Sequence, residues 1–341
     1  MDAKITKNRL SRLLAYDWVK ILALIVAFIV GWMVLFTSTE SKIRPSQRFT
    51  VISYYCNDTL SDDFENLLSD SKNKDKIFSY ETLEGPFRLD LTKTGLNDIV
   101  SVLESRFATS EGDLMFVPYI PYAEEDDLAY ERTYADNFFN RFSDNVYKLD
   151  TEADRNGPSN LFFVKYEAYI NGFYYGDYKA GNLDEYAVEQ NFRRHVKETG
   201  DKRFRKESLI KEALPLEKER IKKYRDALVE FNGYLQSGVI EIVEMNRKDD
   251  KGNILWTGDS AINLCPDESK MGNLKKYLSY TVQEEYEGVD EQTGEPITLT
   301  RSVKTAKDMY AMILYHEKVE PGYEYESILY LNYLIKHSLT A

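Results

Sequence analysis

Tyrosine is the residue type whose number and placement most suggest chemistry in this sequence. The chain has 341 residues, of which 26 are Tyr, 17 are Phe and 3 are Trp. An aromatic ring stacks on sugars and apolar ligands, and the phenol hydroxyl adds a hydrogen bond that orients them. Tyrosine is also frequent in protein cores and at protein interfaces. The tyrosines therefore have two interpretations: they pack in the core or at a partner interface, or they bind a small ligand.

Catalysis has no comparable signal. The three histidines, His195, His316 and His337, lie in separate segments, and no H-x-x-x-H, G-x-S-x-G or Walker sequence occurs. Acidic residues are so numerous that their presence alone identifies no acid–base pair. We predict a protein that is not an enzyme and needs no cofactor. An enzyme that acts on cell-wall glycans through two carboxylates ranks as a third hypothesis.

The sequence predicts no metal site. Cys56 and Cys265 are the only cysteines, and zinc needs more ligands than they supply. Whether the two form a disulfide stays open. The stretches DDKGN (249–253) and DEQTGE (290–295) lack the alternating ligands and closing glutamate of a calcium loop, so hairpin turns explain them better.

Strand and helix patterns alternate over residues 49–122. We predict strands at 49–55, 76–83 and 113–120 and helices at 57–71 and 95–112. This β-α-β-α-β order is typical of a parallel sheet covered by helices, in which ligands bind beyond the carboxyl ends of the strands. The residues that we expect to line a ligand site there, together with a distant tryptophan, are Tyr54, Tyr55, Asn57, Glu84, Tyr119, Tyr122 and Trp256.

A Gly-Asp pair joins the second predicted helix to the third strand. Gly112 can end a helix in the left-handed conformation, and Asp113 can then bond to a neighbouring backbone group. We expect this corner to have a structural role.

The rest of the chain is richer in helices. We predict a helix over 123–142 and a charged helical segment that ends near residue 236, with Pro215 in the first turn of its best part. Two hairpins follow, with turns at 249–253 and 290–296, and then a strand, a Pro-Gly turn and an apolar helix over 308–339. One stripe of the charged segment is apolar and comprises Ile221, Tyr224, Leu228, Phe231 and Leu235.

A hydrophobic run near the N-terminus predicts a membrane span. Residues 21–36, ILALIVAFIVGWMVLF, would extend about 24 Å as a helix. With Trp18, Val19 and residues 37–39 the stretch reaches the roughly 20 residues that a bilayer core needs. We predict a signal anchor over 18–39, with a cleaved signal peptide and a buried core helix as the alternatives. Lys and Arg before the span favour a cytoplasmic N-terminus, which would place the C-terminal domain outside the cytoplasm.

Charge is distributed unevenly along the chain. The first 40 residues carry a net charge of +2 and the remaining 301 carry −15, which gives the formal total of −13. A nucleic-acid-binding protein needs a basic face to neutralise phosphates. We therefore exclude nucleic acid as a partner.

Residues 49–122 resemble the first half-lobe of an extracellular solute-binding protein with the type 2 periplasmic-binding fold. The resemblance rests on FTVISYY (49–55), on the amphipathic helix that follows it, and on LESRFATSEGDLMFVP (103–118). In that last stretch Gly112, Asp113 and the apolar run 114–117 match the family's corner. The resemblance implies an α/β fold that binds a sugar, a peptide or an ion between two lobes and closes by a hinge motion. It identifies no ligand-binding residue.

Two hypotheses follow. The first is a membrane-anchored extracytoplasmic protein that binds a small solute, such as a saccharide or peptide, in an inter-lobe cleft. The second is a degenerate binding fold that serves as a structural or protein-interaction module of a membrane or envelope assembly, because the chain lacks the lipoprotein cysteine of such exported proteins. The predicted segments are a cytoplasmic tail (1–17), the anchor (18–39), a linker (40–48), an α/β lobe (49–122), a helix-rich second lobe with hairpins (123–303) and a strand and helix returning to the first lobe (304–341).

Overall fold

The computed structural model of the protein describes most of the chain: residues 18–39, 47–54, 63–64, 66, 71–82, 86–90, 96–121, 133–149, 161–249, 251–289, 296–315 and 322–340. The chain divides into two units, Met1–Arg44 and Pro45–Ala341, which are described separately.

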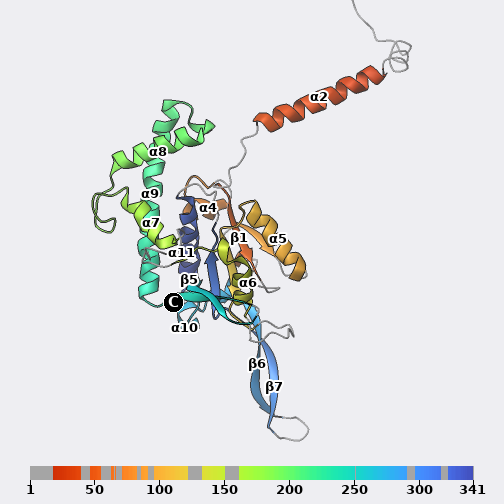
Figure 1. The fold of residues 1–341 in the computed structure, drawn as a ribbon, viewed down its shortest axis with the longest axis vertical. Coiled ribbons are helices and arrows are strands. Elements are labelled where there is room, and N and C mark those ends of the chain that lie inside the picture. The colour runs from red at the N-terminus through yellow and green to blue at the C-terminus, as the bar shows by residue number, and fades with distance from the viewer. Residues whose placement is uncertain are drawn as a thin grey trace, which may run out of the picture. The chain divides into compact units, whose positions relative to one another are not determined.

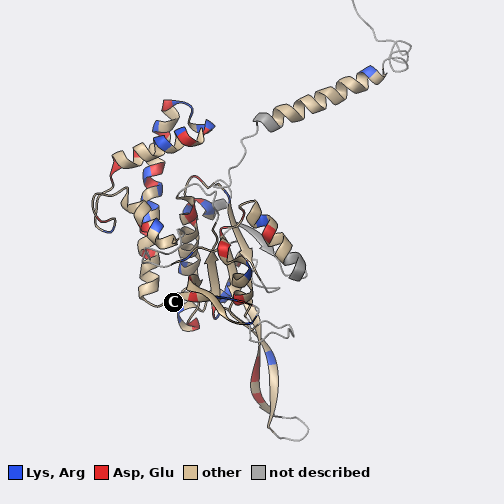
Figure 2. Ribbon diagram, viewed as in Figure 1, with Lys and Arg blue, Asp and Glu red and all other residues tan. Residues whose placement is uncertain are grey.

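The first unit contains helix α2, Trp18–Thr39 (Figure 1). Its window Trp18–Phe36 is long and apolar enough to cross a bilayer, a property that signal sequences near an N-terminus share. Lys20 is the one charged residue of α2, and it lies in the first turn (Figure 2). The predicted apolar helix is confirmed, whereas its orientation stays a prediction.

The second unit is built on a mixed six-stranded sheet with the order β2-β1-β3-β8-β5-β4. The strands β1, β2 and β3 are parallel, and β8 pairs antiparallel with both β3 and β5. The chain therefore returns to its first strands after residue 300, and the hairpin β4–β5 extends the same sheet. Their bounds are β1 Phe49–Ser53, β2 Pro86–Asp90, β3 Leu114–Pro118, β4 Glu241–Lys248, β5 Ile254–Asn263 and β8 Met309–Ile313.

Helices cover both faces of this sheet, while the strands β6, Tyr280–Val289, and β7, Pro296–Thr305, form a separate two-stranded hairpin (Figure 1). The mixed α/β class predicted from the sequence is confirmed at this level. The helices are α4 Ser71–Ile77, α5 Leu96–Ala108, α6 Tyr134–Phe142, α7 Phe162–Asn171, α8 Glu185–Thr199, α9 Glu207–Gln236, α10 Glu268–Met271 and α11 Glu326–Ser338, with 3-10 turns η2 Ser143–Asn145, η3 Lys202–Phe204, η4 Leu274–Lys276 and η5 Tyr323–Tyr325.

The central strands are buried on both faces because successive side chains alternate between two cores. In β3, Leu114 and Phe116 pack with α11 and α9, whereas Met115 and Val117 pack with α5 and α6. All four side chains are inaccessible to solvent. This explains why β3 reads as a continuous apolar run in the sequence.

The second predicted strand is wrong. Residues 76–83 were expected to form it, but α4 ends at Ile77, a bend follows, and the parallel strand is β2, residues 86–90. Phe78 packs on Phe49 and Tyr330, with ring centroids 4.9 and 5.9 Å apart, and the Ser79 N–H donates to the Glu326 carboxylate. The apolar residues of this segment are therefore buried in the core although they lie in a turn. Their composition resembles that of a strand, so the sequence alone does not distinguish the two.

The position of Pro215 is also corrected. It lies inside α9, which begins eight residues earlier at Glu207. Proline leaves the carbonyl four residues before it without a helical partner. Both Lys211 and Pro215 are exposed, so water can hydrate that carbonyl. The predicted apolar stripe is confirmed, since Ile221, Tyr224, Leu228 and Phe231 are buried.

Other predicted elements agree with the structure where it describes them. The helix expected at 95–112 is α5, both hairpins form, and the C-terminal strand and helix are β8 and α11. Most of the helix expected at 57–71 and the first half of the one expected at 123–142 lie outside the described residues. The boundaries drawn between lobes at 122 and 303 stay predictions.

In the Gly-Asp corner Asp113 bonds the neighbouring backbone as we expected, but Gly112 does not end the helix, because α5 ends at Ala108. Gly112 adopts φ +113°, and the Asp113 Oδ2 accepts the Thr50 N–H at 2.6 Å. The Asp113 backbone also bonds Thr50 and Leu314, so the corner connects β1, β3 and the end of β8. Desolvation raises the pKa of Asp113 to about 7, and the hydrogen bond from Thr50 opposes part of that rise.

We predict that Gly112→Ala destabilises the protein by about 2–4 kcal/mol, because it adds both steric overlap and left-handed strain. A Cβ atom there would lie 2.9 Å from Cδ1 of both Ile52 and Leu314, which are buried. Urea unfolding of residues 45–341 measures the change. The control is Gly233→Ala, where a Cβ meets nothing within 4 Å inside α9 and should stabilise by up to about 1 kcal/mol. Equal effects of the two substitutions would contradict the role assigned to the corner.

Candidate functional site

The structure describes three of the seven residues that the sequence placed at a ligand site. Tyr54, Tyr119 and Trp256 are described, whereas Tyr55, Asn57, Glu84 and Tyr122 lie outside the described residues. Ligand contact by any of the seven stays a prediction.

Tyr54 lies beneath helix α6. Its side chain is 2% exposed, its ring is 5.4 Å from that of Phe138, and its hydroxyl accepts a hydrogen bond from Asn137 Nδ2 at 3.2 Å. Burial raises the pKa of Tyr54 to about 12. In this conformation Tyr54 contacts α6 and offers no surface to a solute.

A capping box fixes the start of α6 at this place. Thr133 Oγ1 accepts the Asp136 N–H, and the Asp136 carboxylate accepts the Thr133 N–H. The Tyr134 N–H donates to the carbonyl of Ile120, just beyond β3. The first turn of α6 thus covers the carboxyl ends of β1 and β3, where the sequence predicted a ligand to bind.

The two other described residues make separate contacts. Tyr119 is 42% exposed and stacks on Tyr310 with ring centroids 5.0 Å apart. Trp256 packs on Phe139 of α6, and the Lys148 ammonium lies 4.1 Å from the centroid of its ring. Tyr54 and Trp256 therefore pack on α6 and Tyr119 packs on β8, and the described contacts do not gather the three around one hollow.

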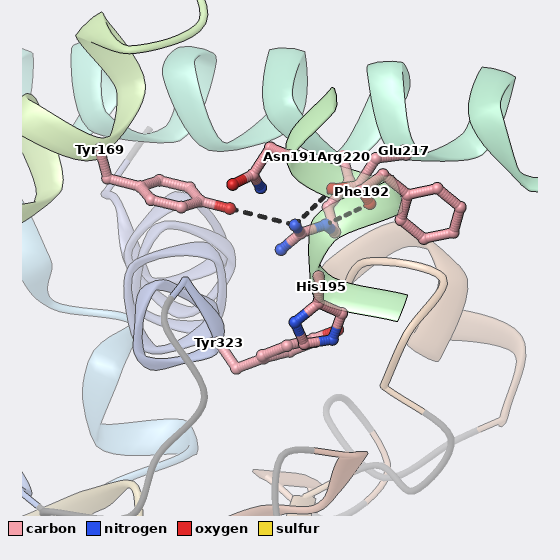
Figure 3. A pocket seen from close by; sticks show the side chains of 7 residues that line it. All are labelled: Tyr169, Asn191, Phe192, His195, Glu217, Arg220 and Tyr323. Atoms are coloured by element: carbon pink, nitrogen blue, oxygen red, sulfur yellow. Dashed lines mark hydrogen bonds and ion pairs between the residues drawn. The ribbon is translucent and has the colours of Figure 1, made fainter. Parts of the chain in front are cut away.

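A buried polar cluster lies between α7, α8, α9 and η5 (Figure 3). Its centre is Arg220, which donates to both carboxylate oxygens of Glu217, at 2.6 and 2.8 Å, and to the Tyr169 hydroxyl at 3.1 Å. The guanidinium also lies 5.1 and 5.2 Å from the ring centroids of Tyr224 and Tyr323. Arg220 and Glu217 are 5% and 2% exposed, so each charge depends on the other for compensation.

Hydrogen bonds extend this cluster to the helices beside the sheet. The Tyr80 hydroxyl donates to Glu217 at 3.2 Å, and the Tyr224 hydroxyl donates to Glu326 at 2.7 Å. Glu326 in turn accepts the backbone N–H and the hydroxyl of Ser79. The cluster thus ties α9 to α7, α11 and the turn after α4.

The cavity within the cluster is too small for a solute. It has a volume of about 20 Å³ and is lined by polar and aromatic side chains, His195 among them. A single water needs roughly 10–15 Å³ by the same measure, so the cavity accommodates about one water molecule. The cluster is therefore best explained as a structural interaction that holds the surrounding helices together.

An open groove runs between α9 and the segment that ends α4. Its volume is about 450 Å³, within the range of small-molecule sites. Three acids and three basic residues line it, so its charge favours no ion of either sign. The lining residues are Asp75, Phe78, Ser79, Tyr80, Leu216, Glu219, Arg220, Lys222, Lys223 and Asp226.

The hairpin β6–β7 is anchored at its base and exposed beyond it. Its base is anchored, since Tyr280 is buried and its hydroxyl donates to the Lys307 carbonyl at 2.6 Å. Beyond the base, all side chains with described burial over 281–288 and 296–304 are exposed or half-exposed. Figure 1 shows the two strands extending away from the six-stranded sheet.

One face of this hairpin is apolar. Residues directly opposite in an antiparallel pair share a face, and the pairs on this face include Val282–Val303, Tyr286–Leu299 and Gly288–Ile297. Tyr286, Leu299 and Ile297 are 41%, 36% and 36% exposed. Gly288 leaves room for Leu299, whose Cδ1 would lie 2.5 Å from a Cβ at that position. We call this surface, formed by Val282, Glu284, Tyr286, Gly288, Ile297, Leu299, Arg301 and Val303, the hairpin face.

Two further observations bear on chemistry. Among the described residues, no three His, Cys, Asp or Glu side chains are grouped so that they could hold a metal ion. Cys265 is a buried free thiol, and burial raises its pKa to about 12, which keeps it in the unreactive protonated form. Cys56 lies outside the described residues.

Comparison with protein-family models, with curated proteins and with solved structures found no match for this chain. The candidate sites therefore rest on their own geometry.

Sequence reasoning missed both the polar cluster and the hairpin face. The signal for the cluster was its position, since Glu217 and Tyr224 flank Ile221 on the apolar stripe of α9, and Arg220 lies beside it. The signal for the hairpin face was the alternation of apolar and polar residues in the second hairpin, which marks one face of a sheet. Neither pattern says by itself whether that face is covered.

We predict that Arg220→Met destabilises the protein by about 3–5 kcal/mol, because it leaves the Glu217 carboxylate buried without a cation. The double variant Arg220→Met/Glu217→Leu should recover most of the loss in urea unfolding. The control is Arg193→Met, which removes an exposed ion pair with Glu207 and should have a much smaller effect. If Arg220→Met has no larger effect than Arg193→Met, the cluster does not hold the surrounding helices together.

Proposed function

We propose that this protein is a membrane-anchored, non-enzymatic protein-interaction module that acts outside the cytoplasm in a membrane or envelope assembly. The observation that carries the proposal is the hairpin face, an apolar surface on an exposed two-stranded hairpin. A two-stranded hairpin is at best marginally stable alone in water. Apolar side chains gathered on one exposed face are typical of a protein–protein contact.

In this proposal the N-terminal helix determines where in the cell the protein acts. Helix α2 is long and apolar enough to span a bilayer, and Lys and Arg precede it in the sequence. With the N-terminus in the cytoplasm, the unit Pro45–Ala341 acts on the outer side. Lipid is then one partner, through a single span, and an envelope or membrane protein is the other.

The resemblance to type 2 periplasmic-binding proteins fits this proposal as a degenerate version of that fold. Parallel strands β1, β2 and β3 with an adjacent antiparallel β8 support the resemblance. Coverage of the strand ends by α6 argues that a cleft at that edge has been lost. We infer that the α/β body now acts as a scaffold that presents the hairpin.

The test is site-specific photocrosslinking in the membranes of cells that make the protein. A photoreactive phenylalanine analogue replaces Leu299 on the hairpin face, or Thr300 on the opposite face as the matched control. We expect a discrete crosslinked product from position 299 and little from position 300, because only the first is covered by a partner. Equal labelling at both positions, or none at either, would refute the proposal.

Solute binding is a second candidate function, and the groove beside α9 favours it. A screen of sugars, oligosaccharides, peptides and metal ions should then raise the Tm of the protein, since a ligand at a hundredfold excess over its Kd stabilises by about 2.7 kcal/mol. We expect Lys222→Glu, in the groove, to abolish the shift, and Lys211→Glu, on α9 away from the groove lining, to preserve it.

The same screen separates the groove from the strand-end site predicted from the sequence. Loss of the shift in Tyr119→Ala, with Lys222→Glu unaffected, would assign the ligand to the strand ends. No shift in any condition would leave the interaction module as the function.

A further inference from the structure

We propose that the partner of the hairpin face is the hairpin face of a second copy of this chain, packed about a two-fold axis. The inference rests on the proposed function and names the partner at that surface. It depends on how apolar and charged residues are divided between the two faces of the hairpin.

The two faces differ sharply in composition. The face opposite the hairpin face carries four polar pairs and one apolar pair at the far end of the strands: Thr281–Lys304, Gln283–Ser302, Glu285–Thr300 and Glu287–Thr298, and Val289–Pro296. That opposite face is suited to water. The hairpin face, with Tyr286, Ile297 and Leu299 exposed, is suited to burial.

The hairpin face has no net charge. Its only ionic residues are Glu284 and Arg301, which lie opposite each other and form an ion pair at 2.7 Å. The Arg301 guanidinium also lies 5.4 Å from the centroid of the Tyr286 ring. Figure 2 shows acidic residues along β6 and basic residues on β7, so the two charges sit on different strands.

This arrangement is complementary to itself. In a two-fold contact the same surface is used by both copies, so a residue i that meets j is matched by j meeting i. When one hairpin face turns over onto another, β6 of one copy can lie against β7 of the other. Glu284 of each copy then faces Arg301 of its counterpart, while the apolar side chains pack together as in two stacked sheets.

A bilayer surface fits the hairpin less well. Surfaces that lie on membranes carry Lys and Arg next to their apolar residues, to meet anionic lipid. The hairpin face carries one cation and one anion, Arg301 and Glu284, so it has no excess of basic residues to meet such lipid.

The test reverses, one at a time, the two charges that would meet across the two-fold axis of the dimer. Glu284→Arg gives a face with two cations, and Arg301→Glu gives a face with two anions. Each variant alone should dimerise more weakly than the native protein, by about tenfold or more, because like charges meet. Mixed in equal amounts, the two variants should form a heterodimer with near-native affinity, since each cation then meets an anion of the other copy.

The measurement is sedimentation velocity of the full-length chain in lipid nanodiscs or mild detergent, with one variant fluorescently labelled. Thr298→Ser/Thr300→Ser, on the opposite face, is the matched control and should dimerise like the native protein. Tyr286→Ser/Leu299→Ser should be monomeric. Circular dichroism of each variant checks that the body remains folded.

Two results would overturn the inference: a native protein that is monomeric at every concentration, or a mixture that associates no better than its separate variants. The photocrosslink from Leu299 distinguishes this failure from failure of the proposed function. A product of twice 39.7 kDa supports the second copy, and a product with a different protein retains the interaction module while rejecting self-association.

Discussion

A buried charge must keep its counter-charge, and this constraint holds the second unit together. Arg220 and Glu217 lie one turn apart on α9, both hidden from water, and their hydrogen bonds reach Tyr169 on α7 and Tyr80 beyond α4. Tyr224 extends this network through a hydrogen bond to Glu326 at the start of α11. Loss of any member leaves a desolvated polar group without a partner, so the helices that carry them are fixed relative to one another.

The sheet is positioned by the same helices. Helix α11 lies on one face of β1 and β3, and the corner at Gly112 and Asp113 joins those strands to β8. On the other face α6 covers the strand ends through Tyr54 and Asn137. The polar side chains of Asp113, Tyr54 and Asn137 in these contacts bond other parts of the same chain. These contacts cover the strand ends, whereas the groove beside α9 is open.

The hairpin β6–β7 differs from the body because one apolar face is exposed to solvent. Its apolar side chains alternate with polar ones, whereas β3 is apolar throughout. Val282 packs against the core at the base, but Tyr286, Ile297 and Leu299 farther along are exposed. The internal pair of Glu284 and Arg301 cancels the charge of that face without help from the body. Burying this face would remove its apolar area from water, and the cost of desolvating Glu284 and Arg301 would be offset in part by the attraction between them.

Local patterns in the sequence determined the apolar N-terminal helix, the mixed α/β class, the helix at 96–108, the stripe of α9 and both hairpins, because each depends on the spacing of neighbouring residues. Contacts between segments that are distant in the sequence determined the remaining features. Residues 76–82 form a helix end and a buried turn because Phe78 and Ser79 meet Tyr330 and Glu326, some 250 residues later. Likewise Tyr54, which directly follows β1, is buried and Tyr286 in β6 is exposed, because the covering of a face depends on which distant element packs against it.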